Sequence, residues 1–330
     1  MIDTIYIEKE INDSPKTIQI LRKFKSARKI SIDRYGEIFN RKNQNFRVQK
    51  IKPNLILARK HKGFVLPTPE GFGIGDQKNF YFSHMYNCIY DCSYCFLQGM
   101  YSSANYLIFV NFEDFKREIK GVMERNLGES ITFFSGYDCD SVAMESVTNF
   151  INDFIPTFRG HDNALIELRT KSAQTRIFEK LEPISNCVIA YSLMPEELAG
   201  KLDKKAPSVS LRISAMKKLS AMGWKIGLRF DPLIYSDNWK IKYQSLFKEI
   251  YSEIKEENIH SVSLGSLRFP KTYFNKIFSF HRKEEVFSRL DINGGNLVSY
   301  DKDLESEMNT FCKNELLKYC NENKVFHCYS

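Results

Sequence analysis

The sequence predicts an α/β protein, built as a partial (β/α)6 TIM-like barrel with an N-terminal extension. Between residues 79 and 267, short apolar runs alternate six times with polar breaks and helical patterns, which is typical of βα units and a parallel sheet. The chain has 330 residues, 43% of them hydrophobic, and can therefore bury a large core. Polar residues follow the ends of the expected strands, where such barrels carry their chemistry.

Residues 1–78 do not show clean alternation of strand and helix. Prolines and glycines interrupt the pattern repeatedly: Pro15, Pro53, Pro67, Pro69, Gly71, Gly73 and Gly75. We therefore expect residues 1–78 to form an extension packed on a barrel of residues 79–269, with residues 270–330 completing the same domain. Basic residues concentrate between Lys16 and Arg59, which indicates either a backbone-binding face for nucleic acid or a solvated rim.

The elements are expected in the following order. Strands are predicted at 79–85, 131–135, 164–168, 187–193, 225–230 and 261–267, with a short extended segment at 106–110. Asn111 is the expected N-cap of a first helix, and further helices are predicted at 141–158, 175–181, 210–222 and 239–256. Residues 301–320 show a helical pattern, and 324–329 are expected to form a final strand that closes the bottom or edge of the fold.

Three of the eight cysteines crowd into the loop after the first expected strand: Cys88, Cys92 and Cys95. Thiolates this close rarely form disulfides without strain, and they are soft donors that select iron-sulfur clusters, zinc or copper(I). Three cysteines, where four normally hold an iron-sulfur cube, suggest a cluster with one iron left open for chemistry. The structural alternative is a zinc site completed by His84.

Composition restricts the location and the partners. No run of eighteen apolar residues occurs, and residues 1–10 lack the order of a signal peptide, so we expect a cytoplasmic protein with reduced thiols and no membrane partner. The formal net charge of +8 favours an anionic partner such as nucleic acid, a nucleotide or a phosphorylated metabolite. A merely basic surface explains the charge equally well.

The strand ends bring further polar residues to the expected barrel mouth. Beside the cysteine loop these are Tyr137, Asp138, Cys139, Asp140, Arg169, Thr170, Lys171, Ser192, Arg229, Asp231 and Arg268. The charged members either serve the site or pair with one another across the mouth. We expect all of them to face one cavity.

A Cys-x3-Cys-x2-Cys loop with Tyr94 before its third cysteine, placed after the first strand of a six-unit partial barrel, resembles the radical S-adenosylmethionine (SAM) superfamily. Within it, the chain resembles the spore photoproduct lyase family from the extension to the closing segment. The matching stretches are 87–98, 109–111, 140–145, 168–171, 223–227, Trp239 with Tyr243, and 267–269.

The resemblance implies a barrel of the radical SAM type and a [4Fe-4S] cluster, with three irons on Cys88, Cys92 and Cys95 and the fourth chelated by SAM. Reduction by an external one-electron donor of flavodoxin or ferredoxin type then cleaves SAM to methionine and a 5′-deoxyadenosyl radical. The family's cofactor-contacting residues fall on Lys171 and Ser192, while a family serine falls on Cys139. Tyr94 and Asp231 complete the expected cofactor contacts.

Two positions depart from the family pattern. An ungapped reading places Tyr137 where photoproduct lyases have the cysteine that returns hydrogen to the repaired thymine, and Phe96 replaces a tyrosine of the same relay. Phenylalanine has no exchangeable hydroxyl hydrogen. The candidate catalytic residues are therefore Tyr94, Tyr137 and Cys139, with Cys139 as a substitute donor.

The predicted function is that of a radical SAM enzyme, similar to spore photoproduct lyase, acting on DNA or a nucleotide-type substrate, with lesion repair as one such reaction. One alternative keeps the radical chemistry but moves it to a nucleoside, sugar or other small metabolite. A second alternative is a non-catalytic nucleic-acid-binding protein with a structural metal.

Overall fold

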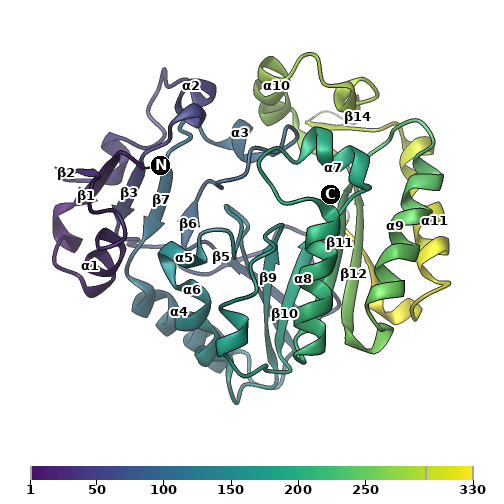
Figure 1. The fold of residues 1–330 in the computed structure, drawn as a ribbon, viewed down its shortest axis with the longest axis horizontal. Coiled ribbons are helices and arrows are strands. Elements are labelled where there is room, and N and C mark those ends of the chain that lie inside the picture. The colour runs from purple at the N-terminus through teal and green to yellow at the C-terminus, as the bar shows by residue number, and fades with distance from the viewer. Residues whose placement is uncertain (1, 294–295, 329–330) are drawn as a thin grey trace.

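The computed structural model describes residues 2–293 and 296–328. Six parallel strands curl into the expected partial barrel, in the spatial order of the chain (Figure 1). They are β5 (Lys78–Phe82), β8 (Ile131–Ser135), β9 (Ala164–Thr170), β10 (Cys187–Ser192), β11 (Lys225–Leu233) and β12 (Ile259–Ser266). The α/β partial barrel predicted from the sequence is confirmed.

Two short strands extend the barrel sheet at its edges. β16 (Val325–His327) pairs in parallel with β12, so the predicted closing strand lies at the edge of the fold, although residue 329 of that prediction is outside the described residues. At the opposite edge, β4 (Leu66–Pro67) pairs antiparallel with β5. The barrel therefore stays open between these two edges.

Helices cover the outer face of the barrel (Figure 1). The long ones are α4 (Phe112–Arg125), α8 (Val209–Ala221), α9 (Trp239–Glu253) and α11 (Lys302–Leu316), and the short ones are α5 (Glu145–Thr148), α6 (Phe150–Phe154) and α7 (Glu196–Leu202). Single 3-10 turns occur at Lys9–Ile11, Tyr35–Glu37, Ile155–Phe158, Phe178–Lys180, Glu256–Asn258, Glu285–Phe287 and Glu322–Lys324.

Three helix predictions need correction. The helix expected at 141–158 is interrupted at Asn149, whose φ of 52° is left-handed, and the one expected at 175–181 is only the 3-10 turn Phe178–Lys180. The short polar connection around Pro183 leaves no room for a regular helix after that turn. Asn111 precedes α4, but its side chain binds the backbone of Lys60 and the carboxylate of Asp114 instead of capping the helix.

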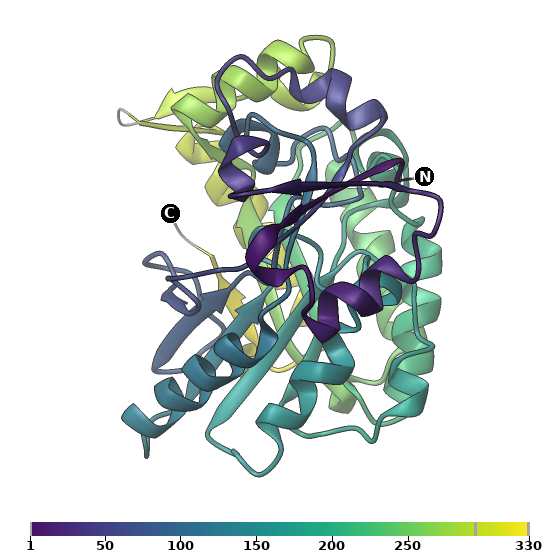
Figure 2. The ribbon, with the colours of Figure 1, turned by 90° about the vertical axis from the view of Figure 1, so that its left-hand side faces the viewer.

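The N-terminal region, in which the sequence shows no clean alternation of strand and helix, forms a sheet of its own. Its strand order is β2 (Arg28–Ile32), β1 (Thr4–Glu8), β3 (Leu55–Ala58), β7 (Tyr106–Phe109) and β6 (Met85–Tyr86), with helices α1 (Pro15–Leu21) and α2 (Phe46–Ile51) between strands. The expected strand at 79–85 breaks after β5, and the extended segment at 106–110 joins this sheet. Figure 2 shows the N-terminal strands running across the barrel strands. Pro15 is harmless because it occupies the first turn of α1, where no N–H bond is needed.

The central strands of the N-terminal sheet, β3 and β7, are buried on both faces. Leu55 and Leu57 of β3 pack into a small apolar cluster with α1, whereas Ile56 and Ala58 pack into the main core. This alternation follows from the two-residue period of a strand. Both cores therefore hold the sheet against the barrel, and Cys139 lies in the smaller one.

The C-terminal part lies beside the cysteine loop. β13 (Arg268–Pro270), β15 (Leu297–Ser299) and β14 (Asp291–Asn293) form an antiparallel sheet, next to α10 (Lys271–Phe280). The short helix α3 (Leu97–Met100) packs on α10 at Gly99, where a Cβ atom would come within 2.5 Å of the Tyr273 side chain. Within the described residues, no helix combines the length and apolarity that a bilayer crossing demands.

Candidate active site

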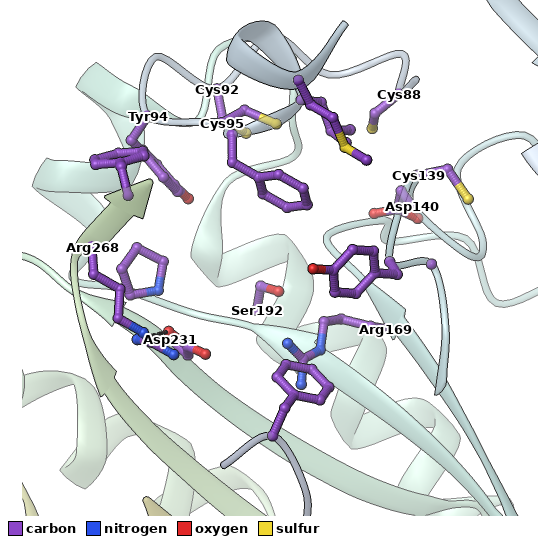
Figure 3. A pocket seen from close by; sticks show the side chains of 18 of the residues that line it. Cys88, Cys92, Tyr94, Cys95, Cys139, Asp140, Arg169, Ser192, Asp231 and Arg268 are labelled. Carbon is purple, nitrogen blue, oxygen red and sulfur yellow. Dashed lines mark hydrogen bonds and ion pairs between the residues drawn. The ribbon is translucent and has the colours of Figure 1, made fainter. Parts of the chain in front are cut away.

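A cavity of about 510 Å³ lies at the carboxyl ends of the barrel strands (Figure 3). Its wall includes most of the residues predicted from the strand ends: Cys88, Cys92, Tyr94, Cys95, Tyr137, Cys139, Asp140, Arg169, Thr170, Lys171, Ser192, Asp231 and Arg268. In Figure 3 the three cluster-type cysteines project from the loop on one side, and Arg169, Asp231 and Arg268 lie on the other. The cavity has the size of an ordinary small-molecule site.

Contacts within the chain hold the cysteine loop (residues 88–95) at its start and its centre. Asn87, just before the loop, has a left-handed φ of 67° and donates to the carbonyls of Ser103 and Asn105 at 2.8 Å each. At the centre, the Gln98 amide donates to the carbonyl of Cys92 at 2.7 Å. These bonds satisfy backbone groups of a loop that has little secondary structure.

Residues remote in the sequence support the same loop. The ammonium of Lys50, a buried residue of α2, donates to the carbonyl of Cys88. Arg47, also on α2, binds the Asp91 carboxylate through two nitrogens at 2.7 and 3.2 Å. The backbone N–H of Ser93 donates to the carbonyl of Leu202, the last residue of α7, at 2.8 Å. The loop is therefore positioned by elements on both sides of it.

The arrangement of the sulfur atoms does not suit one tetrahedral ion. Zinc-sulfur bonds of about 2.3 Å place ligand sulfurs about 3.8 Å apart. Among the described residues, the Sγ atoms of Cys88, Cys92 and Cys95 do not all lie within 4.8 Å of one another, with or without His84. His84 is instead buried with its ring stacked on Phe150 at 3.8 Å, so it does not complete a zinc site. Three soft donors set apart along one side of a cavity fit a multi-iron cluster.

The thiols need a nearby cation to ionise. Burial raises the pKa of Cys88 to about 12, and burial also raises the pKa of Cys92 and of Cys95 above the ordinary thiol range. Lys50 and Lys171 act in the opposite direction on some of these thiols. Iron ions would supply the remaining positive charge that favours thiolates.

A buried ionic network surrounds Lys171. Tyr94 donates its hydroxyl to the Asp203 carboxylate at 2.6 Å, and Arg212 forms an ion pair with Asp203 at 2.8 Å. The Lys171 ammonium lies 4.0 Å from Asp203 and 5.6 Å from the centre of the Tyr94 ring. Burial acts to lower the pKa of Lys171, but Asp203 together with Cys92 and Cys95 outweighs it and the net pKa is raised. Lys171 is therefore charged at neutral pH.

Sequence reasoning missed Asp203 and Arg212. Arg212 occupies the buried stripe of α8 with Val209, Ile213 and Met216, and a charge on an apolar stripe is the signal that was available. Its guanidinium also donates to the carbonyl of Ser192 at 3.0 Å, which anchors the end of β10 at the cavity. The two missed residues thus position three that were predicted: Tyr94, Lys171 and Ser192.

Asp140 organises the ends of β8 and β9. Its Oδ1 atom accepts bonds from the N–H groups of Val142 and Ala143 at 2.9 and 2.8 Å and from the Thr170 hydroxyl at 2.7 Å. Its Oδ2 atom accepts from the N–H of Lys171 at 2.7 Å. These bonds fix the backbone from which the Lys171 side chain projects.

Two strand-end residues do not face the cavity, which corrects the expectation that all of them do. Asp138 turns toward Ser83 and Tyr101, accepting the Tyr101 hydroxyl at 2.9 Å. Arg229 points into the barrel interior, where it pairs with Glu167 at 2.7 Å and neither side chain is exposed. Arg229 points to the same side of β11 as the cavity-lining Asp231, two residues further on, but it lies deeper in the barrel, where Glu167 and Ser261 bind it; Asp138 lies in the loop after β8.

The wall beside β8 is aromatic. The Tyr137 ring lies 4.5 Å from Tyr81, 5.7 Å from Phe96 and 6.4 Å from Phe72, between ring centres. The Arg169 guanidinium stacks over Phe72 at 5.1 Å. Tyr137 thus lines the cavity within an aromatic group.

Cys139 lies near the boundary between the cavity and the smaller core. It lines the cavity but packs in the apolar cluster of the N-terminal sheet, which includes Met85 and Met144. In Figure 3 its sulfur points away from the centre of the cavity. Its roles as a cofactor contact and as a hydrogen donor remain predictions.

Comparisons with known proteins point to one family. A family model described as "Spore photoproduct lyase" matches residues 79–293. The curated spore photoproduct lyase of Clostridium acetobutylicum is 22% identical over 244 residues, covering 71% of this chain and 72% of that protein. The one of Geobacillus sp. is 21% identical over 183 residues, covering 55% of this chain and 52% of that protein, so this match spans about half of the relative's length.

Solved structures of the same name share the fold. A spore photoproduct lyase complexed with dinucleoside spore photoproduct superimposes with a TM-score of 0.83 at 14% identity, covering 100% of this chain and 98% of that chain. A mutant spore photoproduct lyase with bound AdoMet and dinucleoside spore photoproduct gives a TM-score of 0.83 at 15% identity, with the same coverage. At this identity the likeness concerns the fold alone.

Proposed function

The chain belongs to the spore photoproduct lyase family of radical SAM proteins, and from this premise we propose that it is a radical SAM enzyme acting on DNA or a nucleotide-type substrate. The observation that supports the proposal most is that Cys88, Cys92, Cys95 and Lys171 line one cavity. A set of three thiols and a buried ammonium matches the donors that a site-differentiated cluster and the carboxylate of SAM require.

In this proposal Cys88, Cys92 and Cys95 hold three irons of a [4Fe-4S] cluster. Lys171 binds the carboxylate of SAM, and the remaining cofactor contacts are Tyr94, Cys139, Ser192 and Asp231. When bound, the cluster and SAM supply a 5′-deoxyadenosyl radical that removes a hydrogen atom from the substrate.

The chain's own residues would then orient the ligands and keep water away from the reacting atoms. Asp203 and Arg212 hold Lys171 and Ser192 in place before any ligand arrives, so little reorganisation is needed on binding. Apolar side chains of the cavity, including Phe72, Phe96 and Phe269, exclude water from a reactive carbon centre.

Return of hydrogen to the substrate is assigned to Tyr137 or Cys139. Tyr94 is a weaker donor in this arrangement because its hydroxyl is committed to Asp203. The test compares Tyr137→Phe with Cys139→Ala in turnover assays that follow both SAM cleavage and product. Normal product formation by one variant removes that residue from the reaction.

The substrate class rests on charge and on the family. One solved relative is bound to dinucleoside spore photoproduct, and the +8 net charge of this chain suits a polyanion. If DNA is the substrate, its affinity should fall steeply as salt rises, because phosphate contacts exchange with counterions. Salt-insensitive or absent DNA binding favours the second candidate, the same radical chemistry on a nucleoside, sugar or other small metabolite. That candidate is motivated by Phe96 and Tyr137, which replace the family's relay residues.

Two experiments test the proposal. Anaerobic reconstitution with iron and sulfide should give a brown protein that releases 5′-deoxyadenosine when dithionite and SAM are added. Recovery of zinc only, with no cleavage, contradicts both enzyme candidates. Transfer of deuterium from labelled DNA, nucleosides or sugars into 5′-deoxyadenosine then identifies the molecule attacked.

A further inference from the structure

The cysteine loop has a second side, which faces away from the cavity. Asp91 in the loop pairs with Arg47 of α2 at 2.7 Å, and its backbone N–H donates to the carbonyl of Lys204 at 2.8 Å. The Ser93 hydroxyl donates to Glu284 at 3.1 Å. None of these three partners lines the cavity, although five of the eight loop residues do. The loop therefore separates the cavity from an outer face.

This outer face carries mostly positive charge. Its cationic side chains are Arg47, Lys204, Lys205, Arg282 and Lys283, of which the last two lie between the loop-supporting residues His281 and Glu284. The acidic groups are Asp91, Glu284 and Glu285. Asp91 pairs with Arg47 and lies 3.9 Å from the Lys205 ammonium, and Glu284 pairs with Lys204, so that five cations against three carboxylates leave this face with a formal charge of +2.

Two apolar side chains stand exposed on the same face. Ile51 is 82% exposed and Val48 is 63% exposed, and their spacing of three residues places them on one side of α2. Lys205 reaches this end of the helix, since its ammonium donates to the carbonyl of Lys50 at 3.5 Å. Lys50 in turn donates to the carbonyl of Cys88. Two hydrogen bonds, from Lys205 to Lys50 and from Lys50 to Cys88, thus connect this end of α2 to the cysteine loop.

We propose that this outer face is the docking surface for the one-electron donor of the enzyme, a small redox protein with an acidic surface. The inference rests on the proposed function, which requires an external reductant. On docking, one electron leaves the donor's reduced flavin or iron-sulfur centre and reduces the cysteine-bound cluster by one, and no bond or proton is exchanged.

The features of the face match that partner. Redox partners form small, transient interfaces, and complementary charge raises their rate of encounter. A few cations around two exposed apolar side chains suit such a contact. Nucleic acid is disfavoured as the partner of this face. A nucleic-acid substrate must reach the cavity, and no cation of the outer face lines the cavity.

The experiment uses the reconstituted holoprotein without substrate. The probe is reduced bacterial flavodoxin, mixed by stopped flow while the visible absorbance of the cluster is followed, and dithionite serves as a reductant that needs no docking. The double variant Ile51→Asp/Lys283→Glu introduces two carboxylates and removes one ammonium, which lowers the formal charge of the face by three. Its control is Leu127→Asp/Lys248→Glu, since Leu127 is 79% exposed between α4 and β8 and Lys248 is exposed on α9.

We expect the double variant to be reduced by flavodoxin about tenfold more slowly at low salt, with the dithionite rate unchanged. Its affinity for oxidised flavodoxin, measured by calorimetry, should fall by a similar factor, and the control variant should match the parent protein in every measurement. Loss of visible absorbance when dithionite is added to the parent protein first establishes that a reducible cluster is present. If the proposed function is wrong, this step fails before any docking is measured.

Equal flavodoxin rates in the double variant and the parent would overturn the proposal. So would a double variant that loses DNA affinity while its flavodoxin rate is intact, because the face would then be a nucleic-acid surface.

Discussion

The cavity has two walls of different construction. The polar wall consists of Tyr94 and Lys171, with Asp203 and Arg212 behind them, and hydrogen bonds and ion pairs join the Tyr94 hydroxyl and both cations to the single carboxylate of Asp203. The aromatic wall comprises Phe72, Phe96 and Tyr137, and the rings of Phe72 and Phe96 each meet the Tyr137 ring edge to face, at 6.4 and 5.7 Å between ring centres. One wall is held by directional contacts and the other by dispersion.

This difference indicates how the family can vary. A buried ion pair tolerates little change, because removal of one partner leaves an uncompensated charge. Aromatic packing accepts other rings of similar volume at small cost. The departures Phe96 and Tyr137 both fall on the aromatic wall, whereas the residues matched to the family's cofactor contacts, Lys171 and Ser192, adjoin the polar one. We therefore expect cofactor chemistry to be retained and substrate choice to have changed.

The largest expected effect is at the cysteines that adjoin the polar wall. Cys92→Ala should abolish cluster assembly, with iron content and 5′-deoxyadenosine release both falling to background, because two protein ligands hold the cluster poorly. Cys187→Ala is the matched control, since Cys187 is buried in β10 away from the cavity. Full iron content in the Cys92 variant would show that this cysteine is no ligand.

Asp203→Asn should disrupt the polar wall most. It leaves Lys171 and Arg212 buried without their shared carboxylate, at a cost of about 3–5 kcal/mol in the free energy of unfolding. Burial acts to raise the pKa of Asp203, but Lys171, Arg212 and the Tyr94 hydroxyl together hold it below its usual value, so this stability is present above about pH 4 and is lost as pH falls through the lower, folded pKa. Urea unfolding should therefore show a large difference between variant and parent at pH 7 and a smaller one near pH 3. A difference independent of pH would argue against the ionic network.

Tyr137→Leu tests the aromatic wall. Loss of the ring should weaken the binding of a base-containing substrate by about 1–3 kcal/mol, since base-aromatic stacking contributes that much. SAM cleavage without substrate should be unchanged, and Tyr137→Phe should keep the affinity because it keeps the ring. Equilibrium binding and 5′-deoxyadenosine release measure the two effects separately. If Tyr137→Leu loses SAM cleavage as well, the two walls do not act independently.

The smallest expected effect is at Lys50, behind the cysteine loop. Lys50→Met removes the bond to the Cys88 carbonyl and a cation-π contact with Tyr106 at 5.5 Å. It should lower the free energy of unfolding by about 1–2 kcal/mol and shift the cluster's reduction potential to a more negative value, because a positive charge near the sulfurs is lost. Thermal unfolding and a redox titration followed by electron paramagnetic resonance measure these changes. Lys52→Met is the control, since Lys52 is exposed.

The sequence by itself determined the fold class, the family and the residues to examine first. The informative features are all local patterns: strand and helix periodicity, the spacing of Cys88, Cys92 and Cys95, and the polar residues at strand ends. Such patterns can be recognised from the sequence without coordinates. Its errors arose where a local pattern was ambiguous, as at residues 175–181, which were expected to form a helix but contain only the 3-10 turn Phe178–Lys180.

Only the tertiary structure decided which polar residues face the cavity and what holds them there. Tyr94 and Asp203 are 109 positions apart in the sequence, and no local pattern pairs them. The ion pair with Glu167 holds Arg229 inside the barrel, two residues short of the cavity-lining Asp231, whereas Lys171 lies at the cavity, and packing under the N-terminal sheet directed the thiol of Cys139 away from the cavity centre. These outcomes depend on long-range contacts and on strand register, which are set by packing the whole chain.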